Sequence, residues 1–199
     1  AVGAAHAARS AMRDLPTHAR ATMLTAIAAR LRVETEPLAR LIALESGKPL
    51  RFALAEVVRG ALTFELAAGE ARSFGGEVLP IDLEPRGEGR MCIAQRVPRG
   101  IVAAIAPFNF PLNLAAHKVA PALAVGAPCV LKPPPQCPLT ALTLARFMVE
   151  AGVPRGGLSA LHCPPEVAER LARGERVAVL SFTGSDAVGW RLKALAGKK

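Results

Sequence analysis

The sequence has 199 residues, enough to bury a hydrophobic core in one or two domains, and 51% of them are hydrophobic, with alanine contributing heavily. No apolar run approaches the ~20 residues that cross a bilayer, and no secretory signal opens the chain, so we expect a cytoplasmic protein with no membrane contact. The net charge of +9 does not indicate a nucleic-acid partner, because the basic residues are dispersed and the chain has one Trp and no Tyr to stack on bases.

Residues 1–76 are predicted to be helical. An amphipathic helix opens the chain, a second begins after Thr17 as its N-cap, and a third runs from Pro37 to Gly47. A long helix follows over residues 50–72. Its apolar face is formed by Val58, Ala61, Leu62 and Leu66, and we expect these helices to pack on a larger body.

Residues 77–99 change character, because two alternating segments, 77–83 and 90–97, flank a turn-rich stretch at 84–89. This pattern predicts a β-hairpin. Exposed hairpin edges pair with another strand or another chain, so we expect an oligomerisation element here.

Residues 100–199 repeat a strand–helix pattern four times, with strands at 101–106, 128–132, 158–161 and 177–182. Helices are predicted at 111–125, 139–151, 165–172 and 185–196. Short apolar strands without alternation are buried on both faces, and right-handed connections place all four turns at one edge. The predicted fold class is α/β: a Rossmann-like parallel sheet with flanking helices, preceded by the helices and the protruding hairpin.

Two of these turns contain candidate catalytic or cofactor-binding residues, because parallel α/β sheets bind cofactors at this edge. In the turn at 107–111, the side-chain amide of Asn109 can donate to a developing oxyanion; the alternative is an asparagine that caps the next helix. In the turn at 182–185, Gly184, Ser185 and Gly189 form a GxxxxG spacing at a helix start, which suits a phosphate. The alternative there is glycine required for packing.

The four cysteines are widely spaced and match no CxxC pattern, and the four histidines are scattered. We therefore expect neither a disulfide framework nor a metal site.

Four segments in order resemble the NAD(P)-dependent aldehyde dehydrogenase superfamily. They are LESGKP at 44–49, RVPRGIVAAIAPFNFPLNLAAHKVAPALAVGAPCVLKP at 96–133, EAGVPRGG at 150–157 and FTGSDAVG at 182–189. The resemblance implies that Asn109 donates to the thiohemiacetal oxyanion and that the chain binds NAD or NADP. The parent enzyme would oxidise a small aldehyde and form a homo-oligomer.

The same resemblance implies a set of cofactor-binding residues. Lys132 would contact the adenine-side ribose, although a surface lysine is the alternative, and Gly184, Ser185 and Gly189 would hold the pyrophosphate. Pro135 stands where many NAD-preferring members carry Glu, so NADP use is plausible. The remaining positions would line the cofactor: Ile105, Ala106, Pro107, Phe108, Phe182 and Val188.

The family's nucleophilic cysteine and general-base glutamate have no counterpart here, and no cysteine of the chain matches the nucleophile's motif. The sequence thus resembles an amino-terminal fragment: helices at 1–76, hairpin at 77–99 and the first half of the dinucleotide-binding domain at 100–199. We expect it to be inactive alone. The alternative is a stand-alone nucleotide-binding module that pairs with a separate catalytic chain.

Overall fold

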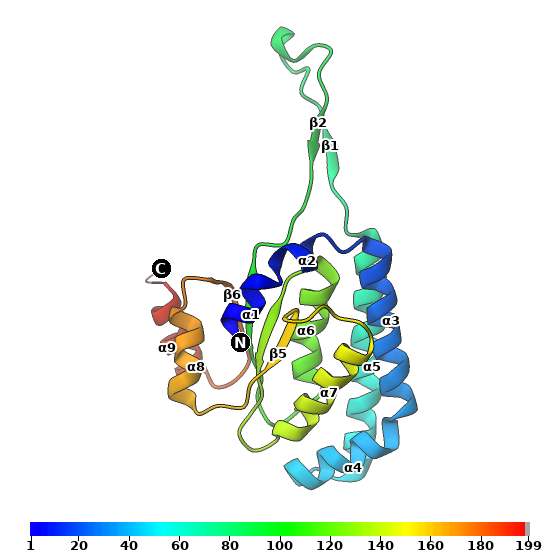
Figure 1. The fold of residues 1–199 in the computed structure, drawn as a ribbon, viewed down its shortest axis with the longest axis vertical. Helices are drawn as coiled ribbons and strands as arrows, with labels where there is room; N and C mark the ends of the chain where they lie inside the picture. Colours follow the sequence, from blue (N-terminus) through cyan, green and yellow to red (C-terminus); the bar gives the residue numbers. More distant parts are fainter. Residues whose placement is uncertain (198–199) are drawn as a thin grey trace.

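The computed structural model describes residues 1–197, and its centre is a parallel β-sheet (Figure 1). Strand β3 (Ile101–Ile105) lies between β4 (Cys129–Lys132) and β6 (Val177–Phe182), and β4 also pairs with β5 (Leu158–Ala160). All three pairings are parallel, so the carboxyl ends of these strands lie at one edge. The predicted α/β fold with a Rossmann-like sheet is confirmed.

A helix follows each strand of the sheet: α6 (Asn113–Val125), α7 (Pro138–Glu150), α8 (Pro165–Arg173) and α9 (Asp186–Ala196). Successive residues of β3 and β4 face opposite sides, as the strand period of two requires. Ala104 and Leu131 join the core cluster that includes α6 and α7, whereas Ala103 and Val130 pack with Leu171 of α8. The sheet therefore has helices on both faces.

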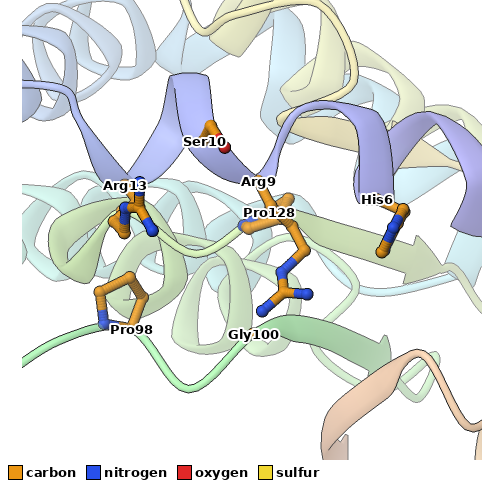
Figure 2. Close-up of a pocket in the computed structure, with 8 residues that line it drawn as sticks. His6, Arg9, Ser10, Arg13, Pro98, Gly100 and Pro128 are labelled. Atoms are coloured by element: carbon orange, nitrogen blue, oxygen red, sulfur yellow. The ribbon is translucent and has the colours of Figure 1, made fainter.

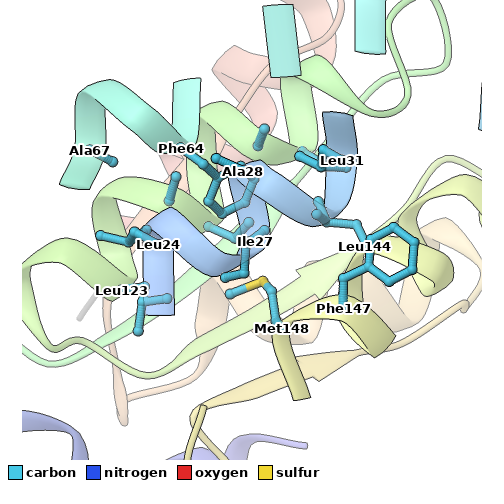
Figure 3. Packing of buried hydrophobic residues seen from close by; sticks show 14 of the residues in the cluster. Leu24, Ile27, Ala28, Leu31, Phe64, Ala67, Leu123, Leu144, Phe147 and Met148 are labelled. Carbon is cyan, nitrogen blue, oxygen red and sulfur yellow. The ribbon is translucent and has the colours of Figure 1, made fainter. Parts of the chain in front are cut away.

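Five helices precede the sheet: α1 (Val2–Ala7), α2 (Arg9–Arg13), α3 (Thr17–Val33), α4 (Thr35–Ser46) and α5 (Leu50–Ser73). Helices α3 and α5 pack against each other and against α6, so that one apolar cluster runs from the helices to the sheet. Figure 3 shows Ile27 and Ala28 of α3 between Phe64 of α5 and Met148 of α7. Such continuous burial is the main stabilising contribution to the fold.

The predicted apolar face of α5 is wrong at three of its four residues. Val58, Leu62 and Leu66 are 46%, 47% and 63% exposed, whereas Ala61 is buried as predicted. The helix also buries Phe64 and four further alanines, at positions 53, 67, 68 and 71. The small side chains allow close approach of α3 and α6: a Cβ at Gly60 would lie 3.4 Å from Leu112. Close packing of backbones therefore outweighs the larger hydrophobicity of the leucines on the other face.

Two further expectations are corrected. Thr17 is not an N-cap, because α3 begins at Thr17 itself and Pro16 holds the capping position without a side-chain hydrogen bond. Strand β6 is not buried on both faces, since Ala178 is exposed and Val179 is 37% exposed. Within residues 1–197, β6 is one of the two edge strands of the sheet, the other being β5, and apolar composition alone does not distinguish an edge strand from a central one.

The predicted hairpin is present but has shorter strands, β1 (Glu77–Leu79) and β2 (Cys92–Ala94), which pair antiparallel. It projects from the body of the molecule (Figure 1), and Val78 and Ile93 are 69% and 65% exposed. A short 3₁₀ helix, η1 (Pro85–Gly87), lies at its tip, where a Cβ at Gly87 would collide with the Ile81 carbonyl. In the described part of the chain the hairpin pairs with no third strand.

Candidate functional site

The carboxyl edge of the sheet contains a cavity of about 420 Å³ between the turns that follow β3, β4 and β6. This volume is within the range of small-molecule sites. Every predicted cofactor residue except Gly189 lines it: Ile105, Ala106, Pro107, Phe108, Lys132, Pro135, Phe182, Gly184, Ser185 and Val188. Gly189 lines the neighbouring hollow together with Phe182, Gly184 and Ser185. The parallel topology therefore brings residues from three separate βα units around one cavity.

Lys132, at the end of β4, is 6% exposed and lines this cavity, so the alternative of a surface lysine is wrong. Burial lowers the pKa of its ammonium, an effect opposed by the nearby Cys163 thiol. Among the described residues, no side chain or carbonyl accepts a hydrogen bond from this ammonium. A buried cation without a protein acceptor is suited to a ligand that brings hydroxyl or phosphate oxygens.

The glycines of the turn after β6 pack against an aromatic ring. A Cβ at Gly184 would come within 2.5 Å of the Phe182 ring, and one at Gly189 within 3.3 Å. These glycines therefore do pack closely against the Phe182 ring, as the packing alternative requires. The turn nevertheless lines the cavity with its backbone at Gly184. Asp186 accepts a hydrogen bond from the Ala187 amide (2.8 Å), so its carboxylate folds back on the start of α9.

Lys118 links α6 to the turn after β6, which sequence analysis missed. Its ammonium donates to the Thr183 hydroxyl (2.7 Å) and lies 3.4 Å from the Ser181 hydroxyl. Burial lowers the pKa of this lysine. The available signal was a lysine beside His117 within the mostly apolar segment 114–125.

Asn109 is exposed and lies in the turn before α6, outside the lining of the cavity. The alternative role as a helix cap is wrong, because α6 has Leu112 at its N-cap position and no side-chain bond from that residue. The side chain of Asn109 has no hydrogen-bond partner among residues 1–197. Its backbone carbonyl, by contrast, accepts a hydrogen bond from the Lys48 ammonium (2.6 Å).

Glu56 of α5 accepts hydrogen bonds from the free backbone amides at the start of α6, a role that sequence analysis also missed. Its Oε1 accepts hydrogen bonds from the backbone amides of Leu112 (2.9 Å) and Asn113 (3.1 Å), while Oε2 pairs with Lys48. The carboxylate side chain is completely buried. The signal was an acidic residue at helical spacing among residues that α5 buries, such as Val57 and Ala61.

Glu45 performs the same task for α7. Its carboxylate accepts hydrogen bonds from the amides of Leu139 (2.6 Å) and Thr140 (2.8 Å) and from the Thr140 hydroxyl (2.6 Å). Charge-assisted bonds to backbone amides are among the stronger helix caps. The segment 44–49 therefore contributes to the starts of two helices on the ligand edge.

Two buried cysteines lack the properties of a nucleophile: Cys137, which precedes α7 at this edge, and Cys129, at the amino end of β4. Cys137 is fully buried, and burial together with Glu45 and Glu56 raises the pKa of its thiol. Burial raises the pKa of Cys129 to about 12. A reactive thiol requires the opposite shift. Within residues 1–197 no three metal-binding side chains cluster, and no helix is long and apolar enough to cross a membrane.

A second cavity of about 290 Å³ lies at the opposite edge, beside the amino ends of β3 and β4 (Figure 2). It is lined by His6, Arg9, Ser10, Arg13, Pro98, Gly100, Gly126 and Pro128. No predicted site residue lies there, and Arg13 already pairs with Asp14 (2.8 Å). The chemistry indicated by the sequence is thus confined to the carboxyl edge.

The whole described chain has close relatives of known sequence and structure. A 3-sulfolactaldehyde dehydrogenase of Priestia aryabhattai is 44% identical over 163 residues, which are 81% of this chain and 34% of that protein. A lactaldehyde dehydrogenase of Methanocaldococcus jannaschii is 38% identical and matches 100% of this chain and 43% of the relative. Aldehyde dehydrogenase 21 of Physcomitrella patens, solved with the product succinate, superposes with a TM-score of 0.95 at 42% identity, covering 100% of this chain and 41% of that one.

A glyceraldehyde-3-phosphate dehydrogenase, GapN of Methanocaldococcus jannaschii, solved with NADP, superposes with a TM-score of 0.92 at 37% identity and covers 100% of this chain and 43% of that one. The chain thus spans between about a third and two fifths of the length of these relatives. The model of the aldehyde dehydrogenase family matches residues 1–199 in full. Since sequence, fold and family model agree over the entire chain, it belongs to the aldehyde dehydrogenase family.

Proposed function

We propose that this chain supplies the dinucleotide site and the oxyanion-donating amide of an NAD(P)-dependent aldehyde dehydrogenase. The observation that carries the proposal is the cavity at the carboxyl edge, which combines apolar walls with the unpartnered ammonium of Lys132. This cavity fits the cofactor. Its apolar walls suit the adenine, and the ammonium suits ribose hydroxyls or a phosphate. Helix α9 begins without a side-chain cap from Ser185, so its first amides can face the pyrophosphate.

The residues of the chain would share the work between binding and charge stabilisation. Lys132 would donate to the ribose, and the backbone at Gly184 and Ser185 would hold the pyrophosphate. NAD(P), when bound, supplies the hydride acceptor. The Asn109 amide would donate to the oxyanion that forms at the aldehyde carbonyl, a contribution of about 3 kcal/mol for a well-placed donor.

NADP is the favoured cofactor. Pro135 lines the cavity without a carboxylate, and the carboxylate of Glu169, which also lines it, pairs with Arg191 (2.7 Å). No uncompensated negative charge therefore opposes a 2′-phosphate next to Lys132. GapN, the related enzyme solved with NADP, supports this preference.

Calorimetric titration of the purified chain with NADP and NAD tests the site. We expect binding of both, tighter for NADP, and at least a tenfold loss of NADP affinity in Lys132→Ala. Arg40→Ala is the control, because Arg40 is an exposed cation paired with Glu36 on α4. Equal affinity in all three proteins, or no binding at all, would contradict the proposed site.

We also propose that the chain has no dehydrogenase turnover by itself and that the hairpin mediates homo-oligomerisation. The exposed apolar residues Val78 and Ile93 and the unpaired edges of β1 and β2 support the second point. Light scattering should show a smaller assembly for Ile93→Lys than for the unaltered protein. Robust NAD(P)H production by the chain alone would refute the first point; activity only after mixing with a separate catalytic chain would favour the pairing alternative.

The aldehyde is proposed to be small, as in the lactaldehyde dehydrogenase relative. A cytoplasmic location is consistent with the four free thiols.

A further inference from the structure

We propose that the buried Lys48–Glu56 pair positions Asn109 for oxyanion stabilisation; this inference rests on the proposed function. The pair lies outside the cofactor cavity and reaches the Asn109 turn from α4–α5, more than 50 residues away in sequence. Neither residue would touch the substrate, so both act through Asn109.

The turn at 107–111 is held at two points. In its middle, the Lys48 ammonium donates to the carbonyl of Asn109 (2.6 Å) and lies 4.1 Å from the centre of the Phe110 ring. Just after it, at the start of α6, Glu56 accepts from the amides of Leu112 and Asn113. Because Lys48 and Glu56 also bind each other, both points are held by one connected unit.

The Lys48–Glu56 unit is largely buried, and burial restricts the positions that its two side chains can adopt. The Glu56 side chain is fully inaccessible and that of Lys48 is 13% exposed. Each partner of the ion pair is also hydrogen-bonded to the backbone around the turn. Such a buried pair resists displacement, because moving either partner leaves a charge without compensation. The solvent-exposed pair between Arg32 of α3 and Glu65 of α5 lacks this constraint.

The side chain of Asn109 has no partner of its own among the described residues, so its location depends on the backbone that carries it. A donor must sit within hydrogen-bond distance of the developing oxyanion, and a displacement of about 1 Å can cost a hundredfold in rate. Lys48 and Glu56 anchor this backbone by direct hydrogen bonds, and we infer that these anchors supply such precision.

The test uses a full-length protein containing this chain, since turnover requires the nucleophile of the family. Lys48→Met removes the donor to the Asn109 carbonyl. This single variant leaves the buried Glu56 carboxylate unpaired and could fail to fold. The double variant Lys48→Met/Glu56→Gln removes that charge as well, while the Gln carbonyl can still accept from the α6 amides, so the double variant should fold. Glu65→Gln is the matched control on α5. Thermal unfolding and NADP affinity are measured for every variant.

In the folded double variant we expect kcat to fall 10- to 100-fold, with KM for the aldehyde and Kd for NADP changed by less than about threefold. Glu65→Gln should keep kcat within twofold. An unaltered protein that binds no dinucleotide and oxidises no aldehyde would refute the proposed function, and this inference with it. An active unaltered protein whose folded double variant keeps kcat within twofold would refute the positioning role alone.

Discussion

Helices α6, α7 and α9 all begin at the carboxyl edge of the sheet, yet their first amides are satisfied in different ways. Those of α6 and α7 are occupied by Glu56 and Glu45, which come from the helical pair α4–α5. At α9, the side-chain bond is a local one, in which the Asp186 carboxylate accepts from the amide of the next residue, Ala187. A helix start that another element caps is closed to an anion, whereas one without such a cap can accept it. The comparison supports the proposal that α9, and not α6 or α7, receives the pyrophosphate.

The largest effect should come from breaking the buried ion pair between Lys48 and Glu56. Glu56→Gln leaves the Lys48 ammonium facing an amide instead of a carboxylate, and loss of one partner of a buried pair costs about 3–5 kcal/mol. Urea unfolding should show this loss, while Glu65→Gln, which disrupts the exposed ion pair between Arg32 of α3 and Glu65 of α5, should unfold close to the unaltered protein. Equal loss in both variants would remove the distinction between buried and exposed ion pairs.

The next effect concerns the packing of the turn before α9. Gly184→Ala places a methyl group 2.5 Å from the Phe182 ring and should cost about 1–3 kcal/mol. Gly189→Ala is the comparison, because its 3.3 Å contact is milder and alanine favours the helix, so we expect a change below about 0.5 kcal/mol. Thermal unfolding distinguishes the two; a harmless Gly184→Ala would show that the ring moves aside.

The cap of α7 should contribute less than that of α6. Glu45→Ala removes three hydrogen bonds to residues 139 and 140 but strands no buried charge, and loss of such a cap costs about 1–2 kcal/mol. Amide hydrogen exchange at Leu139 and Thr140 should accelerate in this variant, with no change at Leu112. Faster exchange at Leu112 would mean that the two caps are coupled.

The smallest effect is the pH dependence of nucleotide binding. Lys132 binds anionic or hydroxyl oxygens best as an ammonium, and burial lowers the pKa at which this ammonium loses its proton. Affinity for NADP should therefore be retained at neutral pH and decline at alkaline pH, before the ordinary lysine value of 10.5 is reached. Lys132→Arg stays protonated. Its affinity should not decline over this range, and a parallel decline would assign the effect to another group.

The sequence by itself determined the α/β class, the order of the elements and the turns that meet at the carboxyl edge. These features follow from local periodicity, from turn residues and from the rule that parallel strands end on one side. That is why Lys132, Phe182 and Gly184, although distant in the chain, were correctly expected to lie close together.

Only the tertiary structure decided which face of α5 is buried, that β6 is an edge strand, and which side chains cap α6 and α7. The contacts of Glu45, Lys48 and Glu56 join residues up to 95 positions apart, and no local pattern encodes which helix start a carboxylate will reach. Hydrophobicity likewise favoured Leu62 and Leu66 over the alanines that α5 buries. The physical reason is the same in both cases: close packing and the compensation of buried charge depend on how whole elements are placed in space.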